Sequence, residues 1–139
     1  MRQLCILVSL LLLSSIAHAM ADCPSSFGEF IAQFEISPEF QSRNTHYPLQ
    51  ASLVDGSTSP EPKTVTYKIK SPTDSQYRRV AFPTKQKQAA VPLERKDIQQ
   101  NNGEWKVKFT KPDTDYTFAY FFKQSAGCWQ LVKFEDYSL

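Results

Sequence analysis

Two cysteines carry the chemistry that can be assigned most directly in this sequence of 139 residues. Cys5 lies in an apolar N-terminal run, which leaves Cys23 and Cys128 in the remainder of the chain. An even pair in an oxidising compartment favours a disulfide, and two buried free thiols are the alternative. A Cys23–Cys128 bond would close a loop of about a hundred residues, for which the chain-entropy model gives up to about 4–5 kcal/mol. We expect the disulfide.

Residues that could support catalysis or bind a metal are few. Outside the N-terminal run, His46 is the one histidine, and a lone histidine is more often a surface or capping residue than a catalyst. There is no second cluster of His or Cys for zinc, no Gly-x-Ser-x-Gly turn and no phosphate-binding glycine loop. The sequence therefore predicts no catalytic set, no metal and no cofactor, and whether the protein is an enzyme stays open.

Candidate binding residues are basic and aromatic. Lysines alternate with apolar residues on two predicted strands, so they would share the outward face. If those strands are neighbours, they form a basic patch for an acidic protein partner; solubility and edge protection are the alternative. Arg78 and Arg79 could extend this patch, and with Tyr77 they could anchor a protein partner. The predicted binding residues are Lys68, Lys70, Tyr77, Arg78, Arg79, Lys106 and Lys108.

The overall charge excludes some partners. The chain has 16 Lys and Arg against 14 Asp and Glu. Without Arg2, which lies in the N-terminal segment described next, the count is 15 against 14. A nucleic-acid or membrane-surface role usually needs a strong basic excess, so we expect neither partner.

The N-terminus has the layout of a secretory signal peptide. Met1-Arg2-Gln3 is basic, residues 4–16 form an almost unbroken apolar run, and Ala17-His18-Ala19 and Ala19-Met20-Ala21 are two possible cleavage signals. A run of thirteen residues is too short to span a bilayer comfortably. We therefore predict a signal peptide over residues 1–21, a single domain over residues 22–139 and a periplasmic or secreted location, with no membrane insertion after cleavage.

The elements that position these residues follow from periodicity and punctuation. Ser26 with Glu29 makes a capping box for a first helix whose apolar face is Phe27, Phe30, Ile31 and Phe34. Ser37-Pro38 starts a second helix, and the stretch 71–100 is ambiguous, with a helix or a strand near Tyr77–Phe82 and a short helix over Leu93–Gln100. Predicted strands cover residues 49–54, 64–70, 105–110, 116–123 and 128–137. This order predicts an α+β fold, with N-terminal helices packed on a curved antiparallel sheet.

Both ends of the chain resemble a known superfold. The residues concerned are Phe27-x-x-Phe30-x-x-x-Phe34, Phe40-Gln41-x-Arg43 followed by Pro48-Leu49, Gly127-Cys128-Trp129-x-Leu131 and Phe134-x-Asp136-x-Ser138. They are similar to bacterial exported domains of an uncharacterised family in the nuclear-transport-factor-two-like superfold. The resemblance implies a cone-shaped domain whose bent sheet and helices enclose a pocket, and its motifs speak to the fold more than to activity.

The same resemblance suggests one catalytic arrangement, because pocketed members of the superfold can be isomerases or dehydratases. Such a site needs an Asp base facing a Tyr or a second acid. Asp136 is the better base, with Tyr67 or Tyr120 as its partner, since Asp113, Asp115 and Tyr116 lie on a predicted turn. Tyr116, Phe118, Tyr120 and Phe122 share one face of a strand, where sheet core is favoured over a ligand-stacking surface.

Two functions follow from these observations. The first is an exported, non-enzymatic binding protein, in its most concrete form a periplasmic inhibitor or immunity protein that neutralises a secreted enzyme or toxin. The alternative is a small-ligand-binding or isomerase-like pocket protein of the same superfold. The first predicts a protein partner, and the second predicts an apolar cavity with Asp136 or a tyrosine hydroxyl inside it.

Overall fold

The computed structural model describes residues 23–139 of the chain. The predicted signal peptide and the two cleavage signals lie outside the described residues and stay predictions. No helix in the described part is long and apolar enough to cross a membrane. Its elements are, in order, α1 (Phe27–Phe34), α2 (Pro38–Arg43), β1 (Thr45–Asp55), β2 (Lys63–Ile69), α3 (Tyr77–Val80), α4 (Lys85–Ala90), β3 (Glu94–Gln99), β4 (Trp105–Thr110), β5 (Thr117–Ser125) and β6 (Cys128–Asp136).

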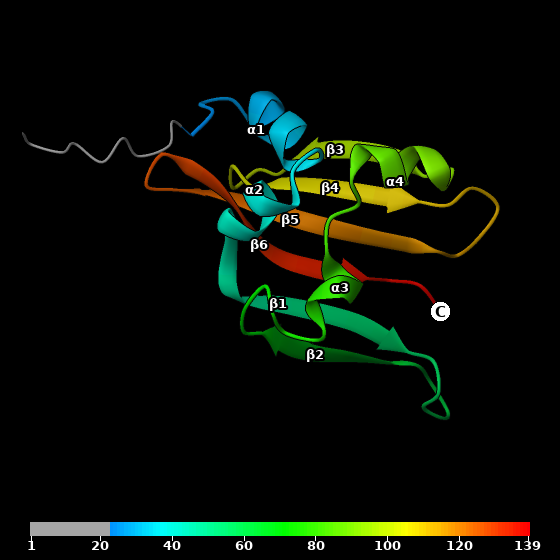
Figure 1. The fold of residues 1–139 in the computed structure, drawn as a ribbon. Coiled ribbons are helices and arrows are strands. Elements are labelled where there is room, and N and C mark those ends of the chain that lie inside the picture. The colour runs from blue at the N-terminus through cyan, green and yellow to red at the C-terminus, as the bar shows by residue number, and fades with distance from the viewer. Residues whose placement is uncertain (1–22) are drawn as a thin grey trace, which may run out of the picture.

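The six strands form one sheet in the order β2-β1-β6-β5-β4-β3 (Figure 1). All neighbouring strands are antiparallel except β1 and β6, which run parallel. The predicted α+β fold with N-terminal helices on a sheet is therefore confirmed, and the sheet is mixed rather than wholly antiparallel. The last strand of the chain, β6, lies between β1 and β5 and joins the β1–β2 hairpin to the β3–β5 meander.

The first two helices begin where the capping residues predict. Ser26 Oγ accepts a hydrogen bond from the N–H of Glu29 at 3.2 Å, and Ser37 Oγ accepts one from the N–H of Phe40 at 3.2 Å. These bonds satisfy N–H groups that have no partner inside the helix. The apolar face predicted for α1 is buried in full.

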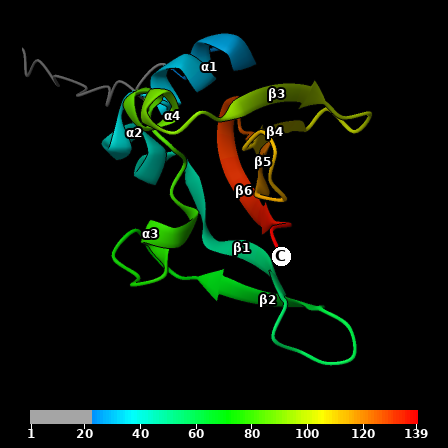
Figure 2. The ribbon, with the colours of Figure 1, turned by 90° about the vertical axis from the view of Figure 1, so that its right-hand side faces the viewer.

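All four helices lie on one side of the sheet, to the left in Figure 2, so that side is the inner face. The core forms between them from aromatic side chains of α1 and the alternating inward residues of β4, β5 and β6. Phe27 stacks on Trp105 with ring centroids 4.6 Å apart, and Phe34 meets Phe122 edge-on at 5.2 Å. Burying one such side chain contributes about 1.5–3 kcal/mol, so this aromatic layer holds the helices on the sheet.

The predicted disulfide is present. Cys23, just before α1, is bonded to Cys128 at the start of β6, with Cα atoms 5.3 Å apart and a sequence separation of 105 positions. The turn before Cys128 has positive φ at Ala126 (50°) and Gly127 (80°), as a two-residue hairpin loop requires. The bond therefore joins the N-terminal helix to the β5–β6 hairpin.

The structure corrects the prediction for residues 93–100. This segment is strand β3 and not a helix, because Glu94–Gln99 pair antiparallel with Trp105–Thr110. As the edge strand it is largely exposed, so its side chains are polar except for Ile98 and show no alternation. Near Tyr77 the structure has a single helical turn. The carboxylate of Asp74 accepts hydrogen bonds from the N–H groups of Lys70 and Gln76, which folds the preceding chain into turns.

The first strand starts earlier than predicted, at Thr45 instead of Leu49. Pro48 lies inside it because the pairing of β1 with β6 shifts register between Thr45 and Gln50. Proline has no N–H for the ladder and is tolerated at such an irregularity.

Candidate functional site

A pocket opens between the inner face of the sheet and the segment formed by α3, α4 and their flanking loops, residues 77–93. We call it the inner pocket; its volume is about 100 Å³. Ligand pockets for drug-sized molecules measure about 300–1,000 Å³, so this one is smaller than a typical drug-sized site. Its lining is Arg78, Arg79, Ala81, Pro83, Lys87, Val91, Leu93, Tyr116, Phe118, Tyr120, Phe134 and Asp136.

The floor of the inner pocket is aromatic. Phe118 and Tyr120 alternate along β5 toward the inner face, and Phe134 lies opposite Tyr120 on β6 with ring centroids 5.1 Å apart. Phe118 and Tyr120 are buried, as the core interpretation of this stripe predicted. Tyr116, at the open end, is 42% exposed and packs its ring 5.2 Å from that of Phe118. The stripe therefore serves as core along β5 and as pocket wall at its exposed end.

Asp136 stands at the edge of this floor. It pairs with Phe118 of β5 and Leu53 of β1, so it belongs to the inward row of the sheet. Its Oδ1 accepts a hydrogen bond from the N–H of Ser138 at 2.9 Å. The resemblance pointed to this residue, and the structure places it in the pocket lining.

The negative charge of Asp136 contributes to the raised pKa of three tyrosines. Burial raises the pKa of Tyr116, and the charge of Asp136 adds to the shift. Burial also raises the pKa of Tyr67, which the cationic Arg79 lowers and Asp136 raises. The pKa of Tyr120 lies well above its ordinary value, first because it is buried and then because of Tyr116 and Asp136. The carboxylate therefore lies in an aromatic surrounding that disfavours a second negative charge.

The hydroxyl of Tyr120 is already engaged. It donates to the carbonyl oxygen of Ala81 at 2.9 Å, in the segment that joins α3 to α4. This bond ties the upper wall of the pocket to its floor. A tyrosine acting as an acid opposite Asp136 would have to direct that proton at the substrate, so the geometry favours a positioning role for Tyr120.

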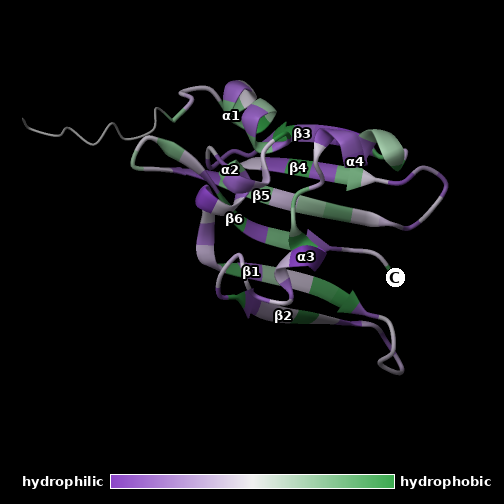
Figure 3. Ribbon diagram, in the orientation of Figure 1, coloured by the Kyte–Doolittle hydropathy of each residue, from purple (hydrophilic) through white to green (hydrophobic). Residues whose placement is uncertain are grey.

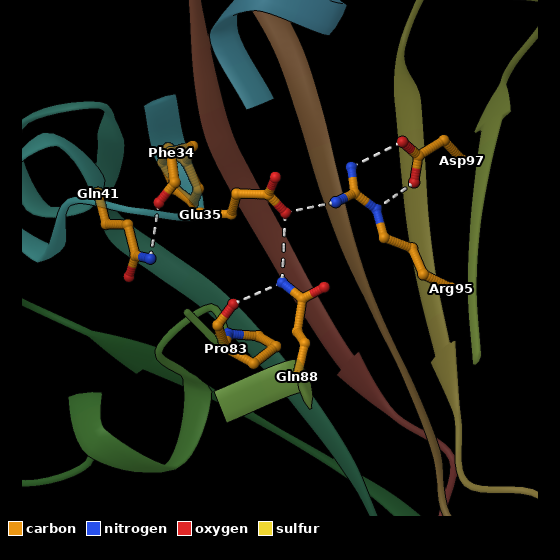
Figure 4. Close-up of polar contacts among 7 residues, drawn as sticks. All are labelled: Phe34, Glu35, Gln41, Pro83, Gln88, Arg95 and Asp97. Carbon is orange, nitrogen blue, oxygen red and sulfur yellow. Dashed lines mark hydrogen bonds and ion pairs between the residues drawn. The ribbon is translucent and has the colours of Figure 1, made fainter. Parts of the chain in front are cut away.

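A polar network fixes α4 over the sheet (Figure 4). Gln88 Nε2 donates to the carbonyl of Pro83 at 2.8 Å and lies 3.5 Å from Glu35 Oε2. The guanidinium of Arg95 on β3 reaches the same Glu35 oxygen at 2.7 Å and binds Asp97 with two further bonds of 2.7 Å. Figure 3 shows α4 passing from hydrophilic to hydrophobic toward its C-terminal end, where Val91 and Leu93 enter the pocket lining.

The predicted anchor Tyr77-Arg78-Arg79 is divided by the structure. Arg78 and Arg79 are exposed and line the inner pocket, and Arg79 also borders a shallow depression beside Tyr67. Tyr77 is half-buried against Tyr47, with ring centroids 6.3 Å apart. The two arginines are therefore available to a ligand, whereas Tyr77 is largely occupied by packing.

The predicted lysine patch does not assemble as one surface of neighbouring strands. Lys68 and Lys70 belong to the β2 end of the sheet and Lys106 and Lys108 to β4, and three strands separate them. Lys106 and Lys133, the latter not indicated by the sequence, instead flank Phe121 from the two neighbouring strands. Their Nζ atoms lie 5.3 Å and 4.0 Å from the ring centroid of Phe121 on the outer face.

The other singled-out residues lie apart from the inner pocket. His46 is exposed on the opposite face, in a shallow groove with Phe121 and Lys133. Asp113 and Asp115 are exposed on the β4–β5 turn, as predicted. Among residues 23–139, no three His, Cys, Asp or Glu side chains gather as a metal ion would need.

Lys87, Val91 and Leu93 are pocket residues that the sequence did not indicate. They lie on or after α4, whose sequence Lys-Gln-Lys-Gln-Ala-Ala is too short for an apolar face to stand out. The N-cap Thr84, whose Oγ1 accepts from the N–H of Lys87 at 3.3 Å, was the signal that could have revealed this helix.

Comparison with known proteins bears on the fold. No family model matches the sequence, and no curated protein matches it. A crystal structure of an NTF2-like protein (nuclear-transport-factor-two-like) from Bacteroides fragilis NCTC 9343 superposes with a TM-score of 0.55 and 19% identity. The match covers 81% of this chain and 47% of that chain, so this chain spans about half the length of that structure. The chain has the NTF2-like fold, as the resemblance at its two ends predicted.

Proposed function

We propose that this protein binds a small molecule in the inner pocket. One observation carries the proposal: an aromatic floor and four charged side chains, Arg78, Arg79, Lys87 and Asp136, converge on a single cavity. An apolar cavity with a few polar groups directed into it is the usual form of a ligand site. The NTF2-like fold supports a pocket of this kind, enclosed between helices and a bent sheet.

Binding accounts for the geometry better than isomerisation does. The Tyr120 proton is directed at Ala81, and one oxygen of Asp136 is held by the N–H of Ser138. Both groups are thus fixed by the protein backbone, which suits a rigid recognition surface.

Native mass spectrometry of the oxidised protein, purified from its own source, tests this proposal. We expect a bound small molecule, whose identity follows from its mass. The variant Val91→Phe should fill the cavity and abolish the adduct. The matched control Val132→Phe, at a half-buried position on the outer face, should retain it. An adduct that survives Val91→Phe would place the ligand elsewhere and overturn the proposal.

The inhibitor or immunity role is the second candidate, favoured by the exposure of Arg78 and Arg79. Exposed arginines are common anchors in protein interfaces. A pull-down of the oxidised protein from the cell envelope and secreted fractions tests it. A stoichiometric enzyme or toxin that loses activity in the complex, and is released by Arg78→Ala, would replace the small-molecule proposal.

We also propose that the protein acts in the periplasm or outside the cell. The Cys23–Cys128 disulfide supports this, because such bonds persist in oxidising compartments. N-terminal sequencing of the natural protein should begin at Met20 or Asp22; a chain that begins at Met1 would contradict it.

A further inference from the structure

The charged groups of the inner pocket do not neutralise one another. Among residues 23–139, the ion pairs within 4.0 Å are those of Arg95 with Glu35 and Asp97, and of Lys133 with Glu135. Arg78, Arg79, Lys87 and Asp136 all line the pocket, yet none belongs to these pairs. Opposite charges that share a cavity without meeting leave room for a ligand that touches both.

The surroundings of Asp136 suit an ammonium group. The carboxylate borders a wall of Tyr116, Phe118, Tyr120 and Phe134, whose successive ring centroids lie 5.1–5.8 Å apart. Aromatic faces attract cations, and a carboxylate beside them supplies the counter-charge. An anionic group placed here would meet repulsion from Asp136 instead.

The α3 side of the pocket suits a carboxylate. Arg78 and Arg79 are exposed, adjacent in sequence and both part of the lining, with Lys87 of α4 as a third cation. Guanidinium groups bind carboxylates with paired N–H donors. A ligand that is only a cation would meet three positive side chains on this side.

We propose that the ligand of the inner pocket is a small zwitterion of the amino-acid type, with its ammonium group on Asp136 and the aromatic wall and its carboxylate on Arg78 and Arg79. This inference rests on the proposed function. A cavity of about 100 Å³ limits the side chain of such a ligand to a short apolar group. That group would contact Val91 and Leu93.

Calorimetric titration of the oxidised protein tests the inference with matched probes. The common free amino acids are titrated one at a time, and the tightest is compared with its decarboxylated amine and its deaminated acid. For valine these are isobutylamine and isovalerate, which keep the same isopropyl group. Each analogue loses the charge-assisted hydrogen bonds of one end, so we expect the zwitterion to bind at least about tenfold more tightly than either analogue.

Two variants assign the ends of the ligand. Asp136→Asn should weaken binding of the amino acid at least about tenfold and should not weaken binding of the deaminated acid. The double variant Arg78→Gln with Arg79→Gln should weaken binding of the amino acid and should not weaken binding of the decarboxylated amine. Asp115→Asn and Arg43→Gln are matched controls at exposed positions outside the pocket, and their affinities should equal that of the unaltered protein.

Three results would overturn the inference: no amino acid binds, an analogue binds as tightly as the zwitterion, or Asp136→Asn leaves amino-acid affinity unchanged. Each is distinct from a failure of the proposed function. If a different small molecule co-purifies and is lost in Val91→Phe, the pocket is a ligand site and only the ligand class is wrong. If nothing binds in a manner that Val91→Phe abolishes, both proposals fail.

Discussion

Tyr120 shows how one side chain can serve both the core and the pocket. Its ring is buried among Phe82, Phe109 and Phe134, and its hydroxyl holds the carbonyl of Ala81. The hydroxyl thereby fixes the distance between the floor and the α3–α4 link.

Tyr120→Phe should lower the free energy of unfolding at pH 7 by about 1–3 kcal/mol, because the Ala81 carbonyl loses its partner. The difference in unfolding free energy between the unaltered protein and Tyr120→Phe should become smaller above about pH 10. Burial raises the pKa of Tyr120, so the folded protein keeps this proton where the unfolded chain releases it. The stabilisation by the Tyr120 hydroxyl is complete below its pKa in the unfolded chain. It is lost as the pH rises toward its pKa in the folded protein.

Urea unfolding of both proteins at neutral and alkaline pH measures this effect. The other tyrosines are present in both chains, so their titration cancels in the difference. A gap that stays constant above pH 10 would mean that the Tyr120 hydroxyl ionises in the folded protein.

At the scale of elements, α4 is held by polar contacts more than by apolar burial, since none of its residues is buried. Gln88 and Arg95 both reach Glu35, which follows α1, so one carboxylate connects three elements. The side chains of Arg95 and Glu35 are 22% and 14% exposed, so solvent screens this pair only in part.

Arg95→Met should destabilise the protein by about 1–3 kcal/mol, because Glu35 would remain largely buried without its strongest partner. The larger effect should be local: amide hydrogen exchange of residues 85–93 should quicken more than that of β5. Arg43→Met, at an exposed position, is the matched control and should change neither measurement. Equal acceleration throughout the sheet would show that Arg95 contributes to global stability alone.

Elements with capping residues and regular apolar spacing could be predicted from the sequence. Ser26 and Ser37 mark the starts of α1 and α2, and Trp105, Val107 and Phe109 alternate as β4 requires. β3 could not be recognised, since its Glu, Arg and Lys favour a helix and only pairing with β4 makes it a strand. The parallel pairing of β1 with β6 joins segments far apart in the chain, and no local pattern encodes it.

The candidate site was predictable in part for the same reason. Asp136 and the stripe along β5 could be named from their strands, and Arg78 and Arg79 from their charge. Their convergence depends on where residues 77–93 cross the sheet. That crossing is set by the Tyr120–Ala81 and Gln88–Glu35 contacts, which join residues 39 and 53 positions apart.

For the whole molecule, the disulfide is the largest single constraint that the sequence predicted. Replacing both cysteines with serine should lower the free energy of unfolding by roughly 4 kcal/mol, on the chain-entropy model for a loop of about a hundred residues. Reducing the unaltered protein should have a similar effect. Urea unfolding of the oxidised, reduced and doubly substituted proteins measures this. A reduced protein as stable as the oxidised one would show that the sheet alone suffices.

The central place of β6 sets an order of events for a chain that is being synthesised or threaded through a pore. Until residues 128–136 emerge, the β1–β2 hairpin and the β3–β5 meander have no strand between them, and Cys23 has no partner. Trp129, Leu131 and Phe134 of β6 complete the core, so we expect the domain to close only when this strand is available. We therefore expect the two halves to remain unassembled, and Cys23 unpaired, in any chain that lacks residues 128–136.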